Sequence, residues 1–160
     1  MEALMATSPK DIGYHRNSAI SHILLGQMLV RQNQAAQAVT HFRRALELSQ
    51  EVLVTDPQYF ESKIDVARSQ GNLGNAMFVN GNKAEGVAYL SEAVNIYDET
   101  ALVDTENALL KRDYAEALGW LGSALEKTDK VKSDEFYRAG YALWNDLRSK
   151  GKLSAADLSI

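Results

Sequence analysis

Three histidines are the side chains best suited to metal binding or acid–base catalysis, but their spacing favours neither. His15, His22 and His41 form no HExxH motif and no short His-x-His pair, the spacings that bring two imidazoles to one metal ion. The sequence contains no cysteine, which excludes thiolate catalysis and cysteine-ligated zinc. No GxSxG motif marks a nucleophilic serine. We therefore predict no catalytic residue, no metal site and no cofactor.

A glycine-rich stretch, GNLGNAMFVNG at residues 71–81, raises the question of a phosphate-binding loop. Such a loop follows a strand, opens a helix, and has a Lys-Ser/Thr or acidic partner downstream. Here the glycines lie inside a helical pattern, and GWLG at residues 119–122 repeats the arrangement. We expect Gly26, Gly74 and Gly122 to allow a partner helix to approach closely, at a cost of about 1 kcal/mol each relative to alanine.

These residues belong to a pattern that repeats every 48 positions. A fixed period indicates that one supersecondary unit is stacked several times. Upstream, Ser8-Pro9, Asp56-Pro57 and Asp104-Thr105 follow the same period. The matching positions within the units are Leu25-Gly26, Leu73-Gly74 and Leu121-Gly122; Asn17, Asp65 and Asp113; and Ala19, Ala67 and Ala115.

Each unit is predicted to be a helix, a tight turn and a second helix. Ser8, Asp56 and Asp104 are suitable N-cap residues, so a long helix should begin at each. The predicted turns are Asn33-Gln34, Asn80-Gly81 and residues 128–132, and Asn82 should cap the helix that follows the second turn. No segment shows the alternation of a strand. The predicted fold class is all-α.

The pattern resembles the tetratricopeptide repeat (TPR) signature. It consists of Leu-Gly, a large apolar residue three positions later, then small, large and small residues. The resemblance implies a superhelical array of three antiparallel helix hairpins, a right-handed α-solenoid, in units longer than the usual 34 residues or so. The matching residues are Leu25, Gly26, Leu29, Ala38, Phe42 and Ala45; Leu73, Gly74, Met77, Gly86, Leu90 and Ala93; and Leu121, Gly122, Leu125, Ser133, Tyr137 and Gly140.

The 48-residue period also sets the expected boundaries of the repeats. Residues 8–55, 56–103 and 104–151 are the three expected repeats. Residues 1–7 read as the tail of an upstream repeat, and residues 152–160 as a C-terminal tail. The long units, the Asp-Pro linker and the closing segment ALWNDLRSKGKLSAADL are similar to C-terminal repeat regions of bacterial serine/threonine protein kinases. This second resemblance implies a signalling context, although the chain itself carries no kinase motif.

The first helix of each repeat is expected to line a concave groove that binds a peptide or helix of a partner. Only Asn75 fits the family's clamp for a terminal carboxylate, because the lysine-type position beside it is Gly71, so we expect another mode of binding. The positions that the resemblance assigns to the groove are Ile23, Gln27, Arg31, Arg68, Asn72, Asn75, Phe78, Glu116, Trp120, Ser123 and Lys127.

Charge and hydropathy narrow the choice of partner. The net charge of −4 gives little attraction to nucleic acid or an anionic membrane, and no run of about 18 apolar residues predicts membrane insertion. The absence of cysteine is compatible with the cytoplasm. Two alternatives to partner binding stay open. One is a structural role through self-association as a homodimer or as a spacer, and the other is sensing of a small molecule between the long helices.

Overall fold

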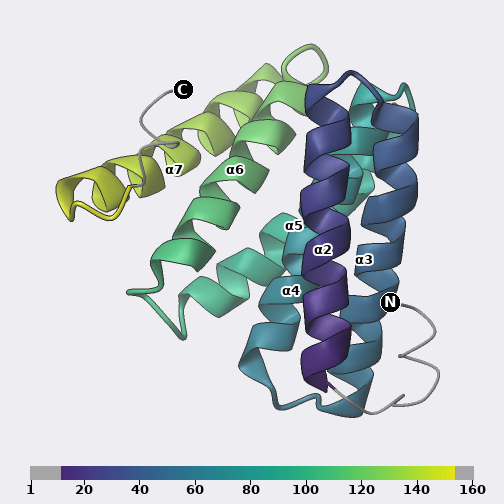
Figure 1. The fold of residues 1–160 in the computed structure, drawn as a ribbon. Helices are drawn as coiled ribbons and strands as arrows, with labels where there is room; N and C mark the ends of the chain where they lie inside the picture. Colours follow the sequence, from purple (N-terminus) through teal and green to yellow (C-terminus); the bar gives the residue numbers. More distant parts are fainter. Residues whose placement is uncertain (1–11, 154–160) are drawn as a thin grey trace. The chain divides into compact units, whose positions relative to one another are not determined.

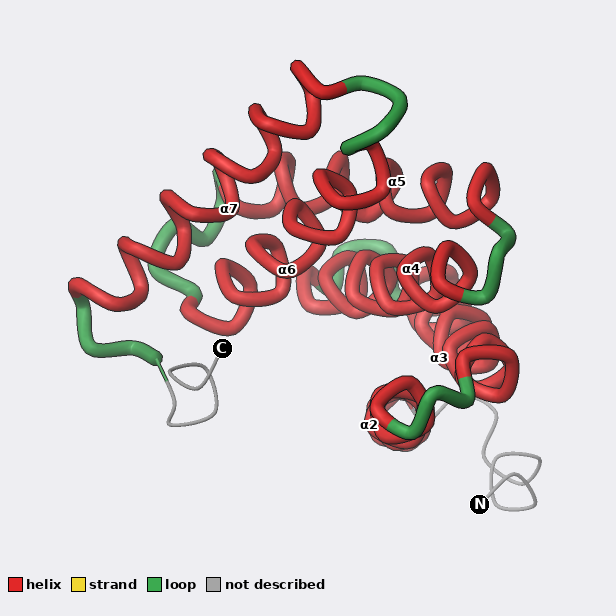
Figure 2. The backbone as a smooth tube through the Cα atoms, turned by 90° about the horizontal axis from the view of Figure 1, so that it is seen from above, coloured by secondary structure: helices red, strands yellow, loops and turns green. Residues whose placement is uncertain are grey.

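The structure, a computed structural model, describes residues 12–153, which form helices joined by short connections (Figures 1 and 2). No strand occurs in this part of the chain, which confirms the predicted all-α fold. The predicted start of the first repeat at Ser8, the predicted tail at residues 1–7, and residues 154–160 of the predicted tail at 152–160 lie outside the described residues. The helices are α2 (Ile12–Arg31), α3 (Ala35–Thr55), α4 (Phe60–Val79), α5 (Lys83–Ala101), α6 (Ala108–Leu125) and α7 (Lys130–Ser149).

The chain divides into two compact units, the first ending at Ile96 and the second beginning at Tyr97. The first unit contains α2, α3, α4 and most of α5. Phe42 and Leu73 are among the fully buried side chains of its core, and each stabilises the fold by about 1.5–3 kcal/mol through removal from water. The core cluster consists of Ala19, Ile23, Ala38, Phe42, Ala45, Leu46, Leu48, Val66, Leu73, Ala76 and Met77.

Two of the mid-helix glycines lie at close helix contacts in this unit, as predicted. A Cβ atom built on Gly26 would lie 2.5 Å from the ring of Phe42. A Cβ on Gly74 would lie 2.8 Å from the carbonyl oxygen of Gly86, which belongs to the opposite helix of the same hairpin. The contact between α4 and α5 is therefore made by backbone against backbone, and a side chain at either glycine would separate the two helices.

The second unit consists of the end of α5 together with the hairpin of α6 and α7. Tyr97 is buried at the end of α5 and stacks on Tyr114 of α6, with ring centroids 5.6 Å apart. Gly122 again faces the opposite helix, since a Cβ built there would lie 3.1 Å from the ring of Tyr137. The glycine contact predicted from the 48-residue period is thus present in this hairpin as well.

The predicted helix starts at Asp56 and Asp104 are wrong. Asp56 follows the last residue of α3, and its carboxylate accepts a hydrogen bond from the amide of Gln58 at 3.2 Å, which forms a turn instead of a helix start. In the next connection Asn107 is the N-cap of α6, and its side chain accepts from the amide of Leu110 at 3.0 Å. Asp104 instead accepts a hydrogen bond from the side chain of Asn107. The local turns that the aspartates favour delay each helix by a few residues.

Two of the three predicted hairpin turns are confirmed. Asn33 and Gly81 adopt left-handed backbone conformations with φ of 58° and 100°, and α5 begins directly after Asn82. The third turn is shorter than predicted, because α7 already begins at Lys130. The side chain of Asp129 caps this helix by accepting from the amide of Lys132 at 3.1 Å.

Candidate functional site

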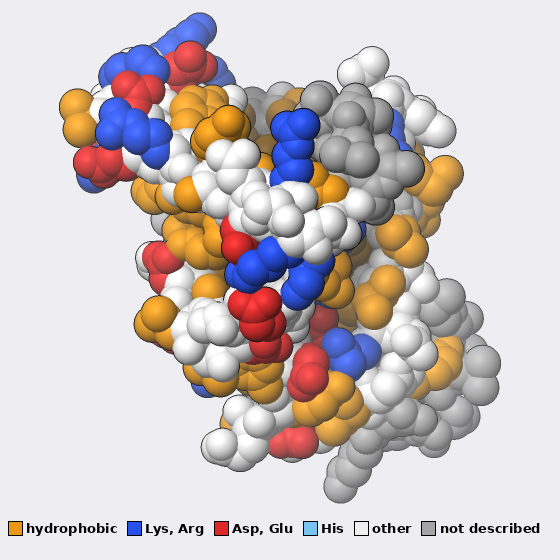
Figure 3. Space-filling model, turned by 90° about the vertical axis from the view of Figure 1, so that its left-hand side faces the viewer, with side chains coloured by type: hydrophobic (Ala, Val, Ile, Leu, Met, Phe, Trp, Pro, Cys, Tyr) orange, Lys and Arg blue, Asp and Glu red, His pale blue; other side chains and the backbone are white. Residues whose placement is uncertain are grey.

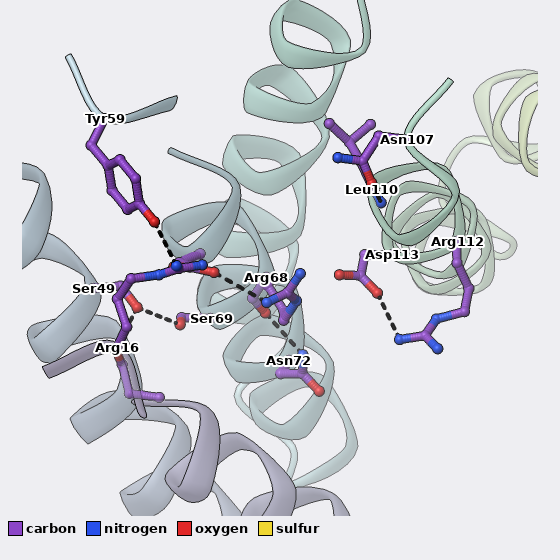
Figure 4. A network of polar contacts seen from close by, with 12 residues as sticks. Arg16, Ser49, Tyr59, Arg68, Ser69, Asn72, Asn107, Leu110, Arg112 and Asp113 are labelled. Atoms are coloured by element: carbon purple, nitrogen blue, oxygen red, sulfur yellow. Dashed lines mark hydrogen bonds and ion pairs between the residues drawn. The ribbon is translucent and has the colours of Figure 1, made fainter. Parts of the chain in front are cut away.

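A ladder of polar contacts joins the first helices of the first two hairpins, α2 and α4. Arg16 of α2 donates through Nε to Asp65 Oδ2 at 2.5 Å, and Arg68 donates to Asp65 Oδ1 at 3.1 Å. Asp65 is only 5% exposed, so its charge is compensated by two guanidinium groups instead of water. Arg16 also donates to the hydroxyl of Tyr59 at 2.7 Å (Figure 4). The hydrogen bond that Arg16 donates to Asp65 raises the pKa of Arg16 above its ordinary value, so Arg16 stays charged.

The ladder continues toward the other end of the two helices. Gln27 of α2 donates to the side-chain oxygen of Asn72 at 3.1 Å, and Asn72 donates to the carbonyl oxygen of Arg68 at 2.9 Å. Arg16 contacts Asp65, and Gln27, further along α2, contacts a residue further along α4. The two helices α2 and α4 therefore lie side by side and run in the same direction. The first helices of the first two hairpins therefore lie next to each other in the first unit.

The structure brings the predicted groove residues of the first unit onto these two helices, with different exposure. Ile23 is buried in the core cluster, and Asn72 is buried by its place in the ladder. The side chains of Gln27, Arg68, Asn75 and Phe78 are half-buried, while Arg31 is exposed. Four of these residues lie near the hairpin turns and are half-buried or exposed, and we term them the turn-end surface: Gln27, Arg31, Asn75 and Phe78.

Phe78 lies beside a cation at this surface. The Nζ atom of Lys83, the first residue of α5, lies 5.8 Å from the centroid of the Phe78 ring. A cation over an aromatic face is attracted by its quadrupole, with a strength of about 0.5–1 kcal/mol at exposed sites. This contact favours the observed position of the Phe78 ring.

The predicted groove residues of the second unit lie on α6 and just after it. Glu116 and Trp120 are half-buried, and Ser123 is exposed on the last turn of the helix. Lys127 is exposed in the turn that follows α6, because the helix ends at Leu125. Three of these four residues are therefore helical, and Lys127 instead projects from a hairpin turn.

A second feature of the first unit is a pocket of about 480 Å³ between α3, α4 and α5. Gln70 is buried at this pocket and donates through Nε2 to the carboxylate of Glu92 at 2.7 Å, while its buried Oε1 atom accepts no hydrogen bond from residues 12–153. The charges around it are mostly acidic. The residues that line the pocket are Arg43, Leu46, Glu47, Gln50, Gln70, Glu85, Ala88, Tyr89 and Glu92.

A third feature is an apolar face of α2 that is exposed to solvent, which we term the α2 face. Leu25 is 43% exposed, whereas Leu73, its equivalent 48 residues later, is fully buried in the core cluster. The difference extends to neighbouring positions, each of which is exposed in α2 and buried in α4. The pairs are Ser21 and Ser69, Leu24 and Asn72, Leu25 and Leu73, and Met28 and Ala76.

Sequence reasoning did not identify the residues that hold the first helices together. Arg16 and Tyr59 occupy no position in the family signature, so no pattern distinguishes them from ordinary polar residues. Asp65 gave a usable signal, because it recurs with Asp113 at one register of the 48-residue period. A charged residue repeated in the middle of an amphipathic helix indicates a buried ion pair, and Asp113 also accepts a hydrogen bond, from Arg112 at 3.3 Å.

Several further observations bear on the kind of site this chain offers. Within residues 12–153, no three or more acidic or histidine side chains gather as metal ligands. The helices of this same region also lack the length and apolar character of a membrane span. On the face drawn in Figure 3, lysine and arginine side chains lie next to aspartate and glutamate side chains, among hydrophobic patches. Charge on this face is thus mixed in sign.

Comparison with known proteins identifies the repeat. The family described as tetratricopeptide repeat matches residues 24–59, which cover the end of α2, all of α3 and the connection that leads into α4. No curated protein matches the chain. The family is generally non-catalytic, and its repeats indicate a scaffold for protein–protein interaction. The match, placed on a helical hairpin with the glycine contact that the signature predicts, shows that this hairpin is similar to a tetratricopeptide repeat and supports the resemblance seen in the sequence.

Proposed function

We propose that the chain is a non-catalytic scaffold that binds a peptide or helix of a protein partner along the first helices of its repeats. The observation that carries this proposal is the ladder from Arg16 through Asp65 to Asn72, which fixes α2 beside α4. A surface held by buried polar contacts is preorganised, so a partner does not pay to order it. Repeat arrays use such surfaces for extended ligands.

The side chains of the turn-end surface favour the binding of an internal segment of a partner chain. Gln27 and Asn75 carry side-chain amides, which can donate to and accept from the backbone of a bound peptide. Phe78 offers an aromatic face, and Arg31 an exposed positive charge. Gly71, beside Asn75, leaves the terminal-carboxylate clamp without its cation, so an internal segment fits better than a chain end.

Capture experiments with matched variants test this proposal. The chain, immobilised, is used to capture proteins from a lysate of its source cell, in parallel with the double variant Asn75→Ala/Phe78→Ala and the control Arg43→Ala on α3. We expect one set of captured proteins to be lost with the double variant and retained with the control. Equal capture by the double variant, confirmed by circular dichroism to be folded, would contradict a site on the first helices.

A more specific context belongs to the same proposal. We infer from the long units, the Asp-Pro linker and the closing segment that the chain is the interaction region of a bacterial serine/threonine kinase that acts in the cytoplasm. The sequence of the complete gene tests this directly. A kinase catalytic domain upstream would support it, and an unrelated domain in that place would remove it.

Self-association is a second candidate function, favoured by the α2 face. The equivalent face of α4 is buried in the first unit, where Asn72 contacts α2 and Leu73 packs in the core cluster. Leu24, Leu25 and Met28 are thus exposed where a further helical hairpin, such as one from a second copy, would bury them. Light scattering over a range of concentrations tests this. A dimer that disappears in Leu25→Glu but persists in the control Arg43→Ala would support it, and a monomer at all concentrations would contradict it.

A further inference from the structure

Helix α7 carries an aromatic face that is open to solvent, which we term the α7 face: Tyr137, Tyr141 and Trp144. Spacings of four and three residues place these side chains on one side of the helix. Tyr141 is 68% exposed, whereas Leu46 and Val94, its equivalents in α3 and α5, are 6% and 4% exposed. The α7 face is therefore the counterpart of a face that is buried in α3 and in α5.

Inside the chain, the equivalent side chains of a second helix pack against the first helix of the next repeat. The hydroxyl oxygen of Ser49 on α3 lies 3.1 Å from that of Ser69 on α4 (Figure 4). Tyr97 of α5, the equivalent of Ser49, stacks on Tyr114 of α6. Trp144 is the equivalent of Ser49 and Tyr97 on α7. In both cases a second helix thus covers the first helix that follows it in the sequence.

We propose that the α7 face of one copy binds the α2 face of a second copy, so that the chain associates head to tail. This inference rests on self-association, the second candidate function above, and names the two surfaces that meet. Among residues 12–153, no second helix precedes α2 and no first helix follows α7. Each face therefore offers the surface that the other lacks, and the junction continues the interface that α3 makes with α4.

The register of the repeats predicts which side chains meet at this junction. Ser21 of the α2 face is the equivalent of Ser69, so the contact between Ser49 and Ser69 becomes one between Trp144 and Ser21. Tryptophan is much larger than serine, and its ring can also cover Leu25, which is 43% exposed one turn beyond Ser21. Large aromatic side chains that become buried supply much of the binding energy of protein interfaces.

A polar contact supports the same junction. Within the first unit, Arg16 donates through Nε to Asp65. Arg112 occupies the position of Arg16 two periods later, and its buried Nε atom donates to no acceptor within residues 12–153. Asn17 occupies the position of Asp65 one period earlier, and its side chain is exposed. At a head-to-tail junction the side-chain oxygen of Asn17 would offer the guanidinium of Arg112 an acceptor.

The two faces differ from each other, so the contact between copies is heterologous. After two copies associate, the pair still has one free α2 face and one free α7 face. Such contacts add further copies until a ring closes, or continue as an open chain. The proposal therefore predicts species larger than a dimer as the protein concentration rises.

Complementation between two blocked variants tests the proposal, with sedimentation velocity to measure association. Leu25→Glu blocks the α2 face, and Tyr141→Glu blocks the α7 face. Each variant alone should associate about 10-fold more weakly than the wild type or worse, because the junction would bury an unpaired carboxylate. An equimolar mixture should form a dimer and nothing larger, since each variant keeps the face that the other has lost.

Two further variants keep this test decisive. Met28→Glu, at a position that is 56% exposed, blocks the α2 face independently if circular dichroism shows that Leu25→Glu is unfolded. Arg43→Ala changes an exposed residue of α3 that belongs to neither face, and it should associate as the wild type does.

The outcomes that would overturn the proposal differ from those that would remove self-association itself. If Tyr141→Glu associates as the wild type does while Leu25→Glu does not, two α2 faces meet and the head-to-tail contact is wrong. The reverse result would mean that two α7 faces meet. A mixture of folded variants that forms no dimer would also overturn the proposal. A wild-type chain that stays monomeric at all concentrations would remove both the junction and self-association.

Discussion

At the scale of single residues, the glycines of the helices differ in what surrounds them. Gly74 faces backbone, since a Cβ built there would lie 2.8 Å from the carbonyl oxygen of Gly86 and 2.9 Å from the amide nitrogen of Leu90. Gly119, also inside a helix, has no atom within 4 Å of a Cβ built on it. One glycine is thus required by packing, while the other only adds flexibility to the unfolded chain.

We predict opposite effects of alanine at these two positions. Gly74→Ala should lower the free energy of unfolding by about 2 kcal/mol or more, because backbone atoms cannot move aside as a flexible side chain can. Gly119→Ala should raise it by roughly 0.5–1 kcal/mol, the difference in helix propensity. Urea denaturation of both variants measures these changes. A stabilising Gly74→Ala would show that α4 and α5 do not meet by close backbone contact.

The carboxylate of Asp65 is the second feature whose consequence belongs to the residue scale. It is buried and held by Arg16 and Arg68. Removal of one partner from a buried ion pair leaves an uncompensated charge, which costs about 3–5 kcal/mol. We therefore expect Asp65→Ala to lower the free energy of unfolding by about 3 kcal/mol.

Chemical denaturation of Asp65→Ala, Arg16→Met and the double variant tests this in a double-mutant cycle. The double variant should be less destabilised than the sum of the single variants, because the two residues interact directly. Additive effects would mean that the ion pair contributes little. Arg44→Met, whose side chain pairs with Glu47 on the surface, is the control and should change the free energy by less than about 1 kcal/mol.

At the scale of the helices, the start of α6 gives a direct test of capping. Asn107→Ala should lower the free energy of unfolding by about 1 kcal/mol, because the amide of Leu110 loses its acceptor. Asp104→Ala should cost less, since Asp104 only accepts a hydrogen bond from Asn107 at 3.0 Å. Thermal unfolding ranks the two variants. A larger effect of Asp104→Ala would mean that Asp104, the position that the 48-residue period predicts, is the N-cap of α6.

The helices and their hairpin pairing could be predicted from the sequence because both depend on short-range regularities. Apolar spacing, the repeated Leu-Gly pairs and the Asn80-Gly81 turn are local signals, and the structure confirms each of them. The starts of α4 and α6 could not be predicted in the same way. An aspartate before proline or threonine favours a turn as strongly as a cap, and only the three-dimensional path of the connection decides between them.

The candidate site was less predictable than the fold. Family positions placed Gln27, Arg68 and Asn72 in the groove, but they gave no indication that these residues bind one another. That outcome depends on Arg16 and Asp65, 49 positions apart, and on the exact offset between two parallel helices. The contact between His22 and His41 has the same origin, because no sequence pattern links two residues 19 positions apart on different helices.

At the scale of the whole molecule, the stability of the chain should depend on pH through a carboxylate network in its second unit. Lys150 lies 3.0 Å from Glu106 and 3.2 Å from Asp146, and Lys111 also donates to Asp146. The hydrogen bond from Lys111, followed by that from Lys150, lowers the pKa of Asp146 below its ordinary value of 3.8. The hydrogen bond from Lys150 lowers the pKa of Glu106 below 4.5.

Carboxylates whose pKa is lower in the folded state stabilise the fold above their ordinary pKa values, and this contribution is lost as the pH falls through the lowered values. We expect the free energy of unfolding to fall as the pH drops below the ordinary pKa values of these two carboxylates, 4.5 and 3.8. The double variant Glu106→Gln/Asp146→Asn should show a shallower decline, measured by urea denaturation at a series of pH values and low salt. An unchanged pH profile would mean that these exposed pairs are screened by water.

The backbone contact between Gly74 and Gly86 restricts how this architecture can change in length. Adding one residue inside α5 before Gly86 would rotate the two parts of the helix by about 100° relative to each other and turn other side chains toward Gly74. Insertions should therefore be tolerated in the connection around Gln58, between hairpins, and rejected within the helices that make this contact. That connection is the natural cut point for building longer or shorter arrays by duplication, which makes each hairpin an exchangeable cassette for protein engineering.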